Sequence, residues 1–276
     1  MAVAPPIAVA PSAAGPAPIP GPTPAPSTAP ARERWLRTVG AGRYPSVLAE
    51  RWTVQGMAKV TGDADATALE AQGSVSVGGV LRAGNVSIEG SLEVSGTAHI
   101  EGRAEIQGPA RFDRSVDAGD LEVAGTLQVQ GPVVVRGLAR WAGETVLHAD
   151  ARCGRLVVEG AIESPGALDA ESVAIHFDRD SRIETLRAPT ITVTRPAGLP
   201  FKLPLIGKDP PTLTVLRMEG SHVELQGTDV EFLRADQIVL GPGCHVARVI
   251  GDVVKVDPTS HVGPESRSPP PYGIRR

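Results

Sequence analysis

The chain has 276 residues and a formal charge of −4, and its residues are 41% hydrophobic but only 3% aromatic. So few aromatic side chains exclude a thick globular core of the usual kind, which relies on Phe, Tyr and Trp for its bulk. The acidic balance argues against nucleic acid as a partner, because that role needs clustered Lys and Arg.

Residues 1–31 are almost entirely Ala, Pro, Gly, Ser and Thr. This composition cannot bury enough apolar surface to outweigh the entropy of ordering, so a disordered tail is predicted. The tail lacks the basic start and the Pro-free apolar stretch of a secretory signal, and no run reaches the roughly 18 apolar residues of a membrane span. Residues 32–39 have two interpretations: a short amphipathic helix with Trp35, Leu36 and Val39 on one side, or a disordered lead-in.

The middle of the chain is organised by an internal repeat. Glycine recurs every six residues in three evenly spaced ladders, which begin at Gly84, Gly119 and Gly154. Within each unit, as in GNVSIE (84–89) and GTLQVQ (125–130), aliphatic residues occupy alternate positions. Because side chains alternate along a strand, each unit is predicted to be a strand of about five residues with one buried face. The glycines mark the bends between strands.

One column of glycines repeats at a longer period: Gly56, Gly73, Gly90, Gly108, Gly125, Gly143 and Gly160. This period is about 17 to 18 residues, and three short strands fill it, which predicts a triangular coil stacked about 4.8 Å from the next one. One coil cannot bury its inward side chains alone, so stacking completes the core. The predicted fold class is all-β: a single-stranded parallel β-helix, or solenoid, of about a dozen such coils over 40–262.

Residues 195–211 break this rhythm with five prolines and are predicted to form a loop that projects from the rod. Apolar residues are hard to bury together in such a segment, and exposed apolar clusters tend to be interaction sites. The alternative is that the loop folds back over a strand. Lys202 and Lys208 leave a peripheral membrane contact open. The candidate interaction residues are Leu199, Phe201, Leu203, Leu205 and Ile206.

Apolar alternation resumes at Leu213 and runs to Val262, and residues 263–276 are predicted to form a second disordered tail. Each end of a β-helix exposes an aliphatic cross-section and unpaired backbone groups, so it needs a cap or another chain. The sequence contains no recognisable capping helix. We therefore expect the rods to stack end to end, with apolar burial contributing about 25 cal/mol per Å². The candidate residues at the C-terminal end are Val253, Val256 and Val262.

Two kinds of β-helix enzyme are alternatives to this interpretation. Hexapeptide acyltransferases place an aliphatic residue directly before the small one, whereas here the nearest aliphatic residues are two before and two after the glycine. Polysaccharide lyases and hydrolases present clustered acids and bases in a cleft. The outward charges of this chain instead predict cross-strand pairing on a solvated face. The positions concerned are Arg82, His99, Asp117, Arg152 and Asp169.

No catalytic residue, cofactor or metal site is predicted. The six histidines lie singly in unlike contexts, and Cys153 and Cys244 are far apart and form no CxxC motif. Asp63 and Asp65 do not match the glycine- and aspartate-rich nonapeptide that binds calcium in some β-rolls.

Four blocks of the sequence are similar to a known family: GAGRYPSV (40–47), VQGMAKVTGD (54–63), the repeated units such as GSLEVSGTAHIEG, and IVLGPGCHVARVIGDVVKVDPTSHV (238–262). In these blocks, and over most of 40–262, the chain resembles the bactofilins, bacterial polymer-forming cytoskeletal proteins. The resemblance implies a right-handed β-helix with disordered tails that assembles without nucleotide and scaffolds other proteins, commonly at the membrane. The chain departs from a compact bactofilin by having about twice the coils and by the loop at 195–211.

We therefore expect a non-enzymatic structural scaffold that self-assembles and recruits other proteins, so that its first partner is itself. The expected location is the cytoplasm, with association at the membrane periphery left open. One alternative is a monomeric rod that binds a partner through the loop at 195–211. The other is a β-helix enzyme acting on polysaccharide or an acyl donor.

Overall fold

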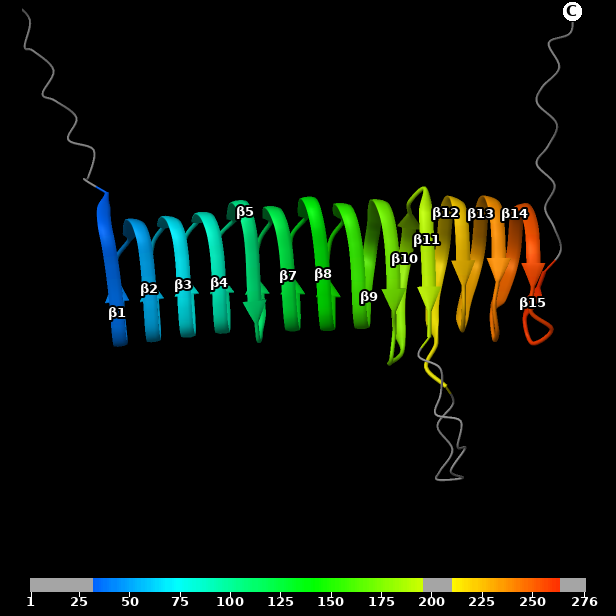
Figure 1. Ribbon diagram of the computed structural model, residues 1–276, viewed down its shortest axis with the longest axis horizontal. Coiled ribbons are helices and arrows are strands. Elements are labelled where there is room, and N and C mark those ends of the chain that lie inside the picture. The colour runs from blue at the N-terminus through cyan, green and yellow to red at the C-terminus, as the bar shows by residue number, and fades with distance from the viewer. Residues whose placement is uncertain (1–31, 196–209, 264–276) are drawn as a thin grey trace, which may run out of the picture. The chain divides into compact units, whose positions relative to one another are not determined.

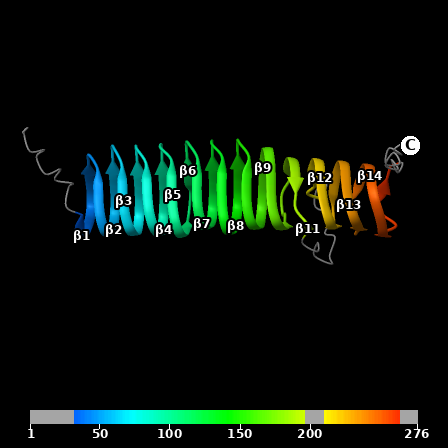
Figure 2. The ribbon, with the colours of Figure 1, turned by 90° about the horizontal axis from the view of Figure 1, so that it is seen from above.

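The computed structural model describes residues 32–195 and 210–263, which wind into a parallel β-solenoid of about 13 turns with about 17 residues per turn (Figure 1). A view turned by 90° shows the same stack of coils from above (Figure 2). The predicted fold class and the predicted number of coils are confirmed. The two predicted tails and the apolar loop residues from Leu199 to Ile206 lie outside the described residues.

All fifteen strands belong to one sheet, in which each strand pairs in parallel with a strand of a neighbouring coil. Most strands are longer than predicted, because the backbone ladder continues around the corners of the coil. In chain order they are β1 (Glu33–Tyr44), β2 (Val47–Val60), β3 (Ala64–Val77), β4 (Leu81–Val94), β5 (Ala98–Gln107), β6 (Ala110–Phe112), β7 (Val116–Val129), β8 (Val133–Leu147), β9 (Ala151–His176), β10 (Ser181–Arg187), β11 (Thr190–Thr194), β12 (Leu213–Leu225), β13 (Thr228–Leu240), β14 (His245–Val256) and β15 (His261–Val262).

The core is a thin aliphatic column that runs inside the coils. Each regular coil contributes three inward pairs of residues, one pair per side, and outward residues alternate with them. In β4 the inward residues are Leu81, Ala83, Val86, Ile88, Leu92 and Val94, each at most 4% exposed. The alternation predicted from the glycine units is therefore the alternation between core and solvent.

The coil length changes along the chain. The pairing of Val47 with Ala64 and of Gly125 with Gly143 gives regular coils of the two lengths predicted. The chain then makes an excursion, because Ser181 pairs with Leu213 and the chain between them is almost twice as long as a regular coil. Beyond the excursion Leu213 pairs with Thr228, so that coil is shorter than the regular ones.

One corner of the solenoid is a column of stacked glycines. Gly73 and Gly90 have φ angles of 131° and 139° and pair with each other across neighbouring coils. A Cβ atom at either position would collide with the carbonyl oxygen of the glycine in the preceding coil. Only glycine combines this φ with so close an approach, which explains why the sequence repeats it.

Residues 32–39 differ from both interpretations offered for them. They form neither a helix nor a lead-in, because Glu33–Tyr44 is a strand that pairs with β2 residue by residue. Leu36 and Thr38 point inward, whereas Trp35 and Val39 point outward and are 67% and 66% exposed. Pairing with the next coil decides the conformation of this segment, which has no glycine or aliphatic alternation of its own.

Candidate functional site at the ends of the solenoid

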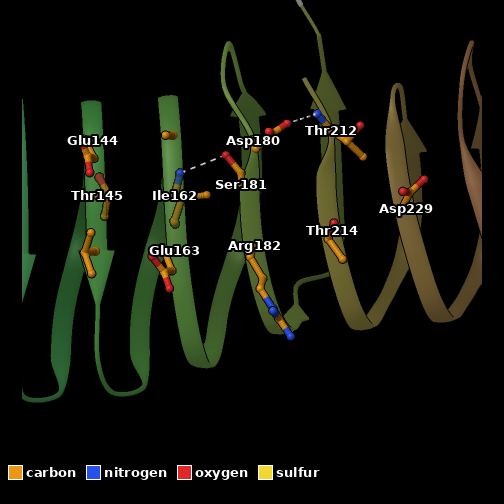
Figure 3. Close-up of a pocket in the computed structure, with 12 residues that line it drawn as sticks. Glu144, Thr145, Ile162, Glu163, Asp180, Ser181, Arg182, Thr212, Thr214 and Asp229 are labelled. Carbon is orange, nitrogen blue, oxygen red and sulfur yellow. Dashed lines mark hydrogen bonds between the residues drawn. The ribbon is translucent and has the colours of Figure 1, made fainter. Parts of the chain in front are cut away.

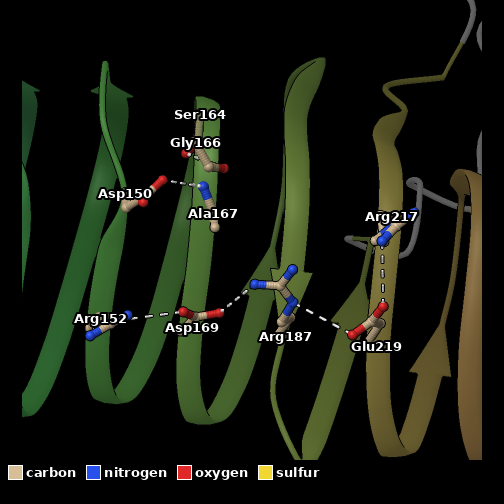
Figure 4. A network of polar contacts seen from close by, with 9 residues as sticks. All are labelled: Asp150, Arg152, Ser164, Gly166, Ala167, Asp169, Arg187, Arg217 and Glu219. Atoms are coloured by element: carbon tan, nitrogen blue, oxygen red, sulfur yellow. Dashed lines mark hydrogen bonds and ion pairs between the residues drawn. The ribbon is translucent and has the colours of Figure 1, made fainter.

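The side faces carry ion pairs between neighbouring coils (Figure 4). Asp169 lies between Arg152 and Arg187 of the coils on either side, at 3.7 and 3.6 Å. Glu219 lies 3.5 Å from Arg187 of the preceding coil and 3.9 Å from Arg217 of its own strand. The side chains are a third or more exposed, so each pair contributes about 0–1 kcal/mol. This row of five charged side chains has the stacked opposite charges of a solvated face, and none of the five is a nucleophile placed beside a base.

The other outward charges singled out in the sequence behave in the same way. His99 Nδ1 lies 3.8 Å from Asp117, whose carboxylate also pairs with Arg136 at 2.5 Å. Arg82 lies 4.0 Å from Asp63. The predicted cross-strand pairing of these residues is confirmed.

A hollow of about 400 Å³ lies on one side face, close to where the excursion returns (Figure 3). It is lined by carboxylates from four coils, those of Glu144, Glu163, Asp180 and Asp229. Asp180 accepts a hydrogen bond from the Thr212 backbone N–H at 3.1 Å, which ties the returning chain to the preceding coil. Throughout 32–195 and 210–263, no three His, Cys, Asp or Glu side chains are grouped to hold a metal ion. The hydrogen bond between Thr212 and Asp180 gives the hollow a structural role.

The N-terminal end is closed from inside by a hydrogen-bonded cluster. The ring of Tyr44 lies against Gly42, where a Cβ would come within 2.7 Å of Tyr44 Cε2. The Tyr44 hydroxyl is 2.8 Å from Thr38 Oγ1, which also accepts a hydrogen bond from Trp52 Nε1 at 3.2 Å. The Tyr44 and Trp52 rings meet edge to face, with centroids 6.4 Å apart. These contacts satisfy the side-chain polar atoms of Thr38, Tyr44 and Trp52 and seal the core there.

The outer surface of the same end is basic and partly apolar. Residues 32–62 contain six Arg or Lys and two Glu, although the whole chain has a formal charge of −4. Trp35, Val39 and Met57 are 67%, 66% and 58% exposed. The Arg51 guanidinium lies over the Trp35 ring, 5.1 Å from its centroid.

As far as the structure describes it, to Gly263, the C-terminal end has no such seal. Val253 and Val256 continue inward columns, since they pair with Ile238 and Leu240, which are fully buried. Val256 is nevertheless 43% exposed, and its neighbour Val254 is 60% exposed. The last strand, β15, pairs only with His245 and Val246. Among the described residues, the remainder of β14 thus has an open backbone edge beside exposed valines.

A tight turn holds β15 in place. The Asp257 carboxylate accepts hydrogen bonds from the backbone N–H and the hydroxyl of Thr259 at 2.9 and 2.7 Å, which hold the pKa of Asp257 below its ordinary value. The Ser260 hydroxyl donates to Gly241 O at 2.7 Å and accepts from the Cys244 N–H at 2.9 Å. The turn therefore anchors the short last strand to the preceding coil.

The predicted residues of the C-terminal end all lie in the last coil but on different columns: Val253 and Val256 pair with Ile238 and Leu240, and Val262 pairs with Val246. Val253 and Val262 are half-buried and Val256 is exposed. The apolar loop residues, from Leu199 to Ile206, lie outside the described residues. Sequence reasoning missed the seal formed by Tyr44 and the exposed position of Trp35. The run of arginines around Trp35 was the signal for that basic end.

The fold defines the class of this protein: a long parallel β-solenoid with chemically different ends. Within the described residues, no helix is long and apolar enough to cross a membrane. A comparison with protein-family models finds no match, and searches of the curated proteins and of the solved structures find none either.

Proposed function

We propose that the protein is a structural scaffold, of the kind that bactofilins represent, which self-associates without nucleotide and recruits other proteins. The observation that carries the proposal is the C-terminal end, where the core column and an open strand edge are exposed together. Unpaired strand edges are templates for pairing with another chain. Exposed valines add an apolar surface whose burial contributes about 25 cal/mol per Å².

The proposal favours contact between two C-terminal ends. The last coil carries both cations, Arg248 and Lys255, and anions, Asp252 and Asp257, which gives two copies opposite charges to pair across a two-fold axis, although Arg248 already lies 3.5 Å from Glu231 of the preceding coil. The N-terminal end offers less apolar surface for self-association, because Tyr44 and Trp52 already fill its interior. Its arginines would also repel the same arginines of a second copy. Contact between C-terminal ends doubles the rod, and a longer polymer needs a second contact.

The test compares Val256→Asp with Val134→Asp. Val134 lies on the outer side of β8 and is 42% exposed, which matches the 43% of Val256. Both variants add the same charge at the same exposure, but only one is at an end. Analytical ultracentrifugation over a range of protein concentrations should show association for the wild type and for Val134→Asp, and monomers for Val256→Asp.

Thermal unfolding by circular dichroism checks that both variants fold. A wild-type chain that stays monomeric at every concentration contradicts the proposal. Equal association of the two variants contradicts the assignment to the C-terminal end.

The apolar segment suggests a second role, as a binding module, since five of its residues between 199 and 206 are aliphatic or aromatic. Deletion of 196–209 separates the two roles. Loss of recruited proteins with unchanged association is expected if the segment is an adaptor, and loss of association contradicts it.

A further inference from the structure

We propose that the open edge of β1 binds an extended acidic segment of a partner protein, which adds to the solenoid as one more strand. This inference deepens the recruiting role proposed above and rests on it, but it uses the opposite end of the rod. The partner is defined by its chemistry: carboxylates spaced to meet Arg37 and Arg43, with apolar residues opposite Trp35 and Val39.

The first observation is that the edge has the geometry of an interior coil. Among the described residues, β1 pairs with β2 only, so its other backbone edge is open. Gly40 continues the glycine column with a φ of 78°, and it pairs with Gly56. A Cβ at Gly56 would collide with the Gly40 carbonyl oxygen, whereas a Cβ at Gly40 would meet nothing within 4 Å. The corner is thus already shaped to receive the backbone of another strand.

The second observation is the charge of the edge. Arg37 and Arg43 point outward on either side of the Gly40 corner, and both are exposed. Arg32 and Arg51 have acidic partners, Asp65 at 2.5 Å and Glu70 at 3.7 Å. In the part of the chain that the structure describes, neither Arg37 nor Arg43 forms an ion pair with a carboxylate. Within 32–195 and 210–263, the exposed Arg34 of this strand also has no carboxylate partner, and Arg37 donates a hydrogen bond to Gln55 Oε1 at 3.1 Å. Cations without acidic partners on an open strand favour carboxylates on the strand that joins it.

A second copy of the chain fits this edge poorly. If the solenoid continued into the C-terminal end of another copy, the column of Arg43 would meet the column that ends at His261, and Arg37 would lie opposite Lys255. If two N-terminal ends met, arginines would face arginines. Like charges directly opposite one another on paired strands are destabilising.

The composition of the chain's two tails makes them equally poor partners for the open edge of β1. Residues 1–31 contain no Asp or Glu and ten prolines, and proline cannot donate to a strand ladder. Residues 264–276 contain one Glu against three Arg. The complementary charge must come from a different protein.

The binding mode also sets the spacing of the carboxylates along the partner strand. In β-augmentation the main-chain hydrogen bonds provide affinity and the alternate side chains provide specificity. Arg37 and Arg43 are six residues apart, so a parallel partner strand carries two carboxylates at the same separation with a bend between them. Trp35 and Val39, which are about two-thirds exposed, flank Arg37 on the same outer row and favour apolar neighbours.

The experiment uses a fluorescein-labelled twelve-residue peptide of alternating valine and threonine, with glutamate at two positions six residues apart. The matched probe carries lysine at the same two positions. Fluorescence anisotropy with the full chain at physiological salt should show the glutamate peptide binding at least about tenfold more tightly than the lysine peptide. The double variant Arg37→Glu/Arg43→Glu should reverse this order, and Arg152→Glu, on a side face, should leave it unchanged.

Hydrogen exchange distinguishes strand addition from simple charge attraction. Bound glutamate peptide should protect backbone amides of β1 on its open edge and leave those of β8 unchanged. Equal preference of wild type and double variant for the glutamate peptide, or no protection in β1, overturns the proposal. So does stronger binding to phosphatidylserine vesicles that is lost in Trp35→Ala, because that result assigns the surface to a membrane.

The Val256→Asp variant separates this inference from the proposed self-association. It should bind the glutamate peptide as the wild type does while failing to associate. Association without peptide binding refutes the acidic partner alone, and peptide binding by a wild type that never associates refutes the assembly alone.

Discussion

The two halves of the solenoid build the same corner with different chemistry. From Gly40 to Gly160 the corner is a glycine column with positive φ, in which each carbonyl packs where a Cβ would otherwise lie. Beyond it, the corner still has positive-φ glycines at Gly227 and Gly243, and buried hydroxyls also hold it. Ser181 Oγ accepts from Ile162 N–H and donates to Arg179 O, both at 3.1 Å, and Thr228 Oγ1 donates to Gln226 O at 3.0 Å.

This difference accompanies a less regular second half. The stacked glycines keep successive coils between 16 and 18 residues long, because each carbonyl must meet the next glycine. A hydroxyl reaches the backbone with a freely rotating bond and tolerates a different number of residues per coil. The long excursion before Leu213 and the short coil after it therefore both fall in the hydroxyl-built half.

The largest effect is expected from Gly90→Ala in the glycine column. The new Cβ would have to displace the Gly73 carbonyl, and the φ of 139° is strained for alanine. We expect a loss of about 3 kcal/mol or more in the free energy of unfolding, measured by urea denaturation.

Gly40→Ala is the matched control, because it has a positive φ but no atom within 4 Å of the new Cβ. Its expected cost is about 1 to 2 kcal/mol, the cost of the left-handed backbone alone. Equal losses for the two variants would show that stacking is not what requires glycine.

A smaller effect is expected from Ser181→Ala in the hydroxyl-built half. Ser181 is buried, and its loss leaves the Ile162 N–H without this acceptor. A buried donor without a partner costs about 1 to 3 kcal/mol, so the urea midpoint should fall accordingly. Ser87→Ala, on an exposed outer position, serves as the control and should change the midpoint little. An unchanged midpoint for Ser181→Ala would show that the Ser181 hydroxyl does not stabilise this corner.

The smallest effect is expected from the two buried cysteines, whose contributions to the free energy of unfolding should depend differently on pH. Burial raises the pKa of the Cys153 thiol from 9.0 to about 12. The pKa of Cys244 is also raised by burial, but hydrogen bonds from the backbones of Thr228 and Gly227, and the charge of Arg195, oppose the shift. The unfolded chain ionises Cys153 first, so the thiol's contribution to stability is complete below pH 9 and is lost as the pH rises toward 12.

The measurement is the difference in unfolding free energy between wild type and Cys153→Ala from about pH 8 to about pH 10.5. That difference should fall above pH 9 by at most about 1.4 kcal/mol per pH unit. Cys244→Ala should give a shallower slope. A flat difference for Cys153→Ala would mean that the thiol ionises in the folded protein as readily as in the unfolded one.

The regular coils could be predicted closely because their signal is local and repeated. Each glycine and each alternate aliphatic residue had the same role in successive coils, so Gly56 to Gly160 gave both the side length and the coil length. The segment around Trp35 could not be assigned, because its strand depends on pairing with β2 and not on its own pattern. The seal by Tyr44 was equally hidden, since it requires Gly42, Thr38 and Trp52 to meet across two coils.

The amino-acid sequence by itself determined the solenoid, its aliphatic core and the position of the excursion, because the regular glycine period leaves only one way to bury the alternate side chains. Only the tertiary structure decided how the two ends differ. Whether an inward residue at an end is sealed or exposed depends on what lies beyond it, and that is a property of the stack. Val256 and Leu240 occupy the same column, yet among residues 32–195 and 210–263 only Leu240 is covered by a further coil.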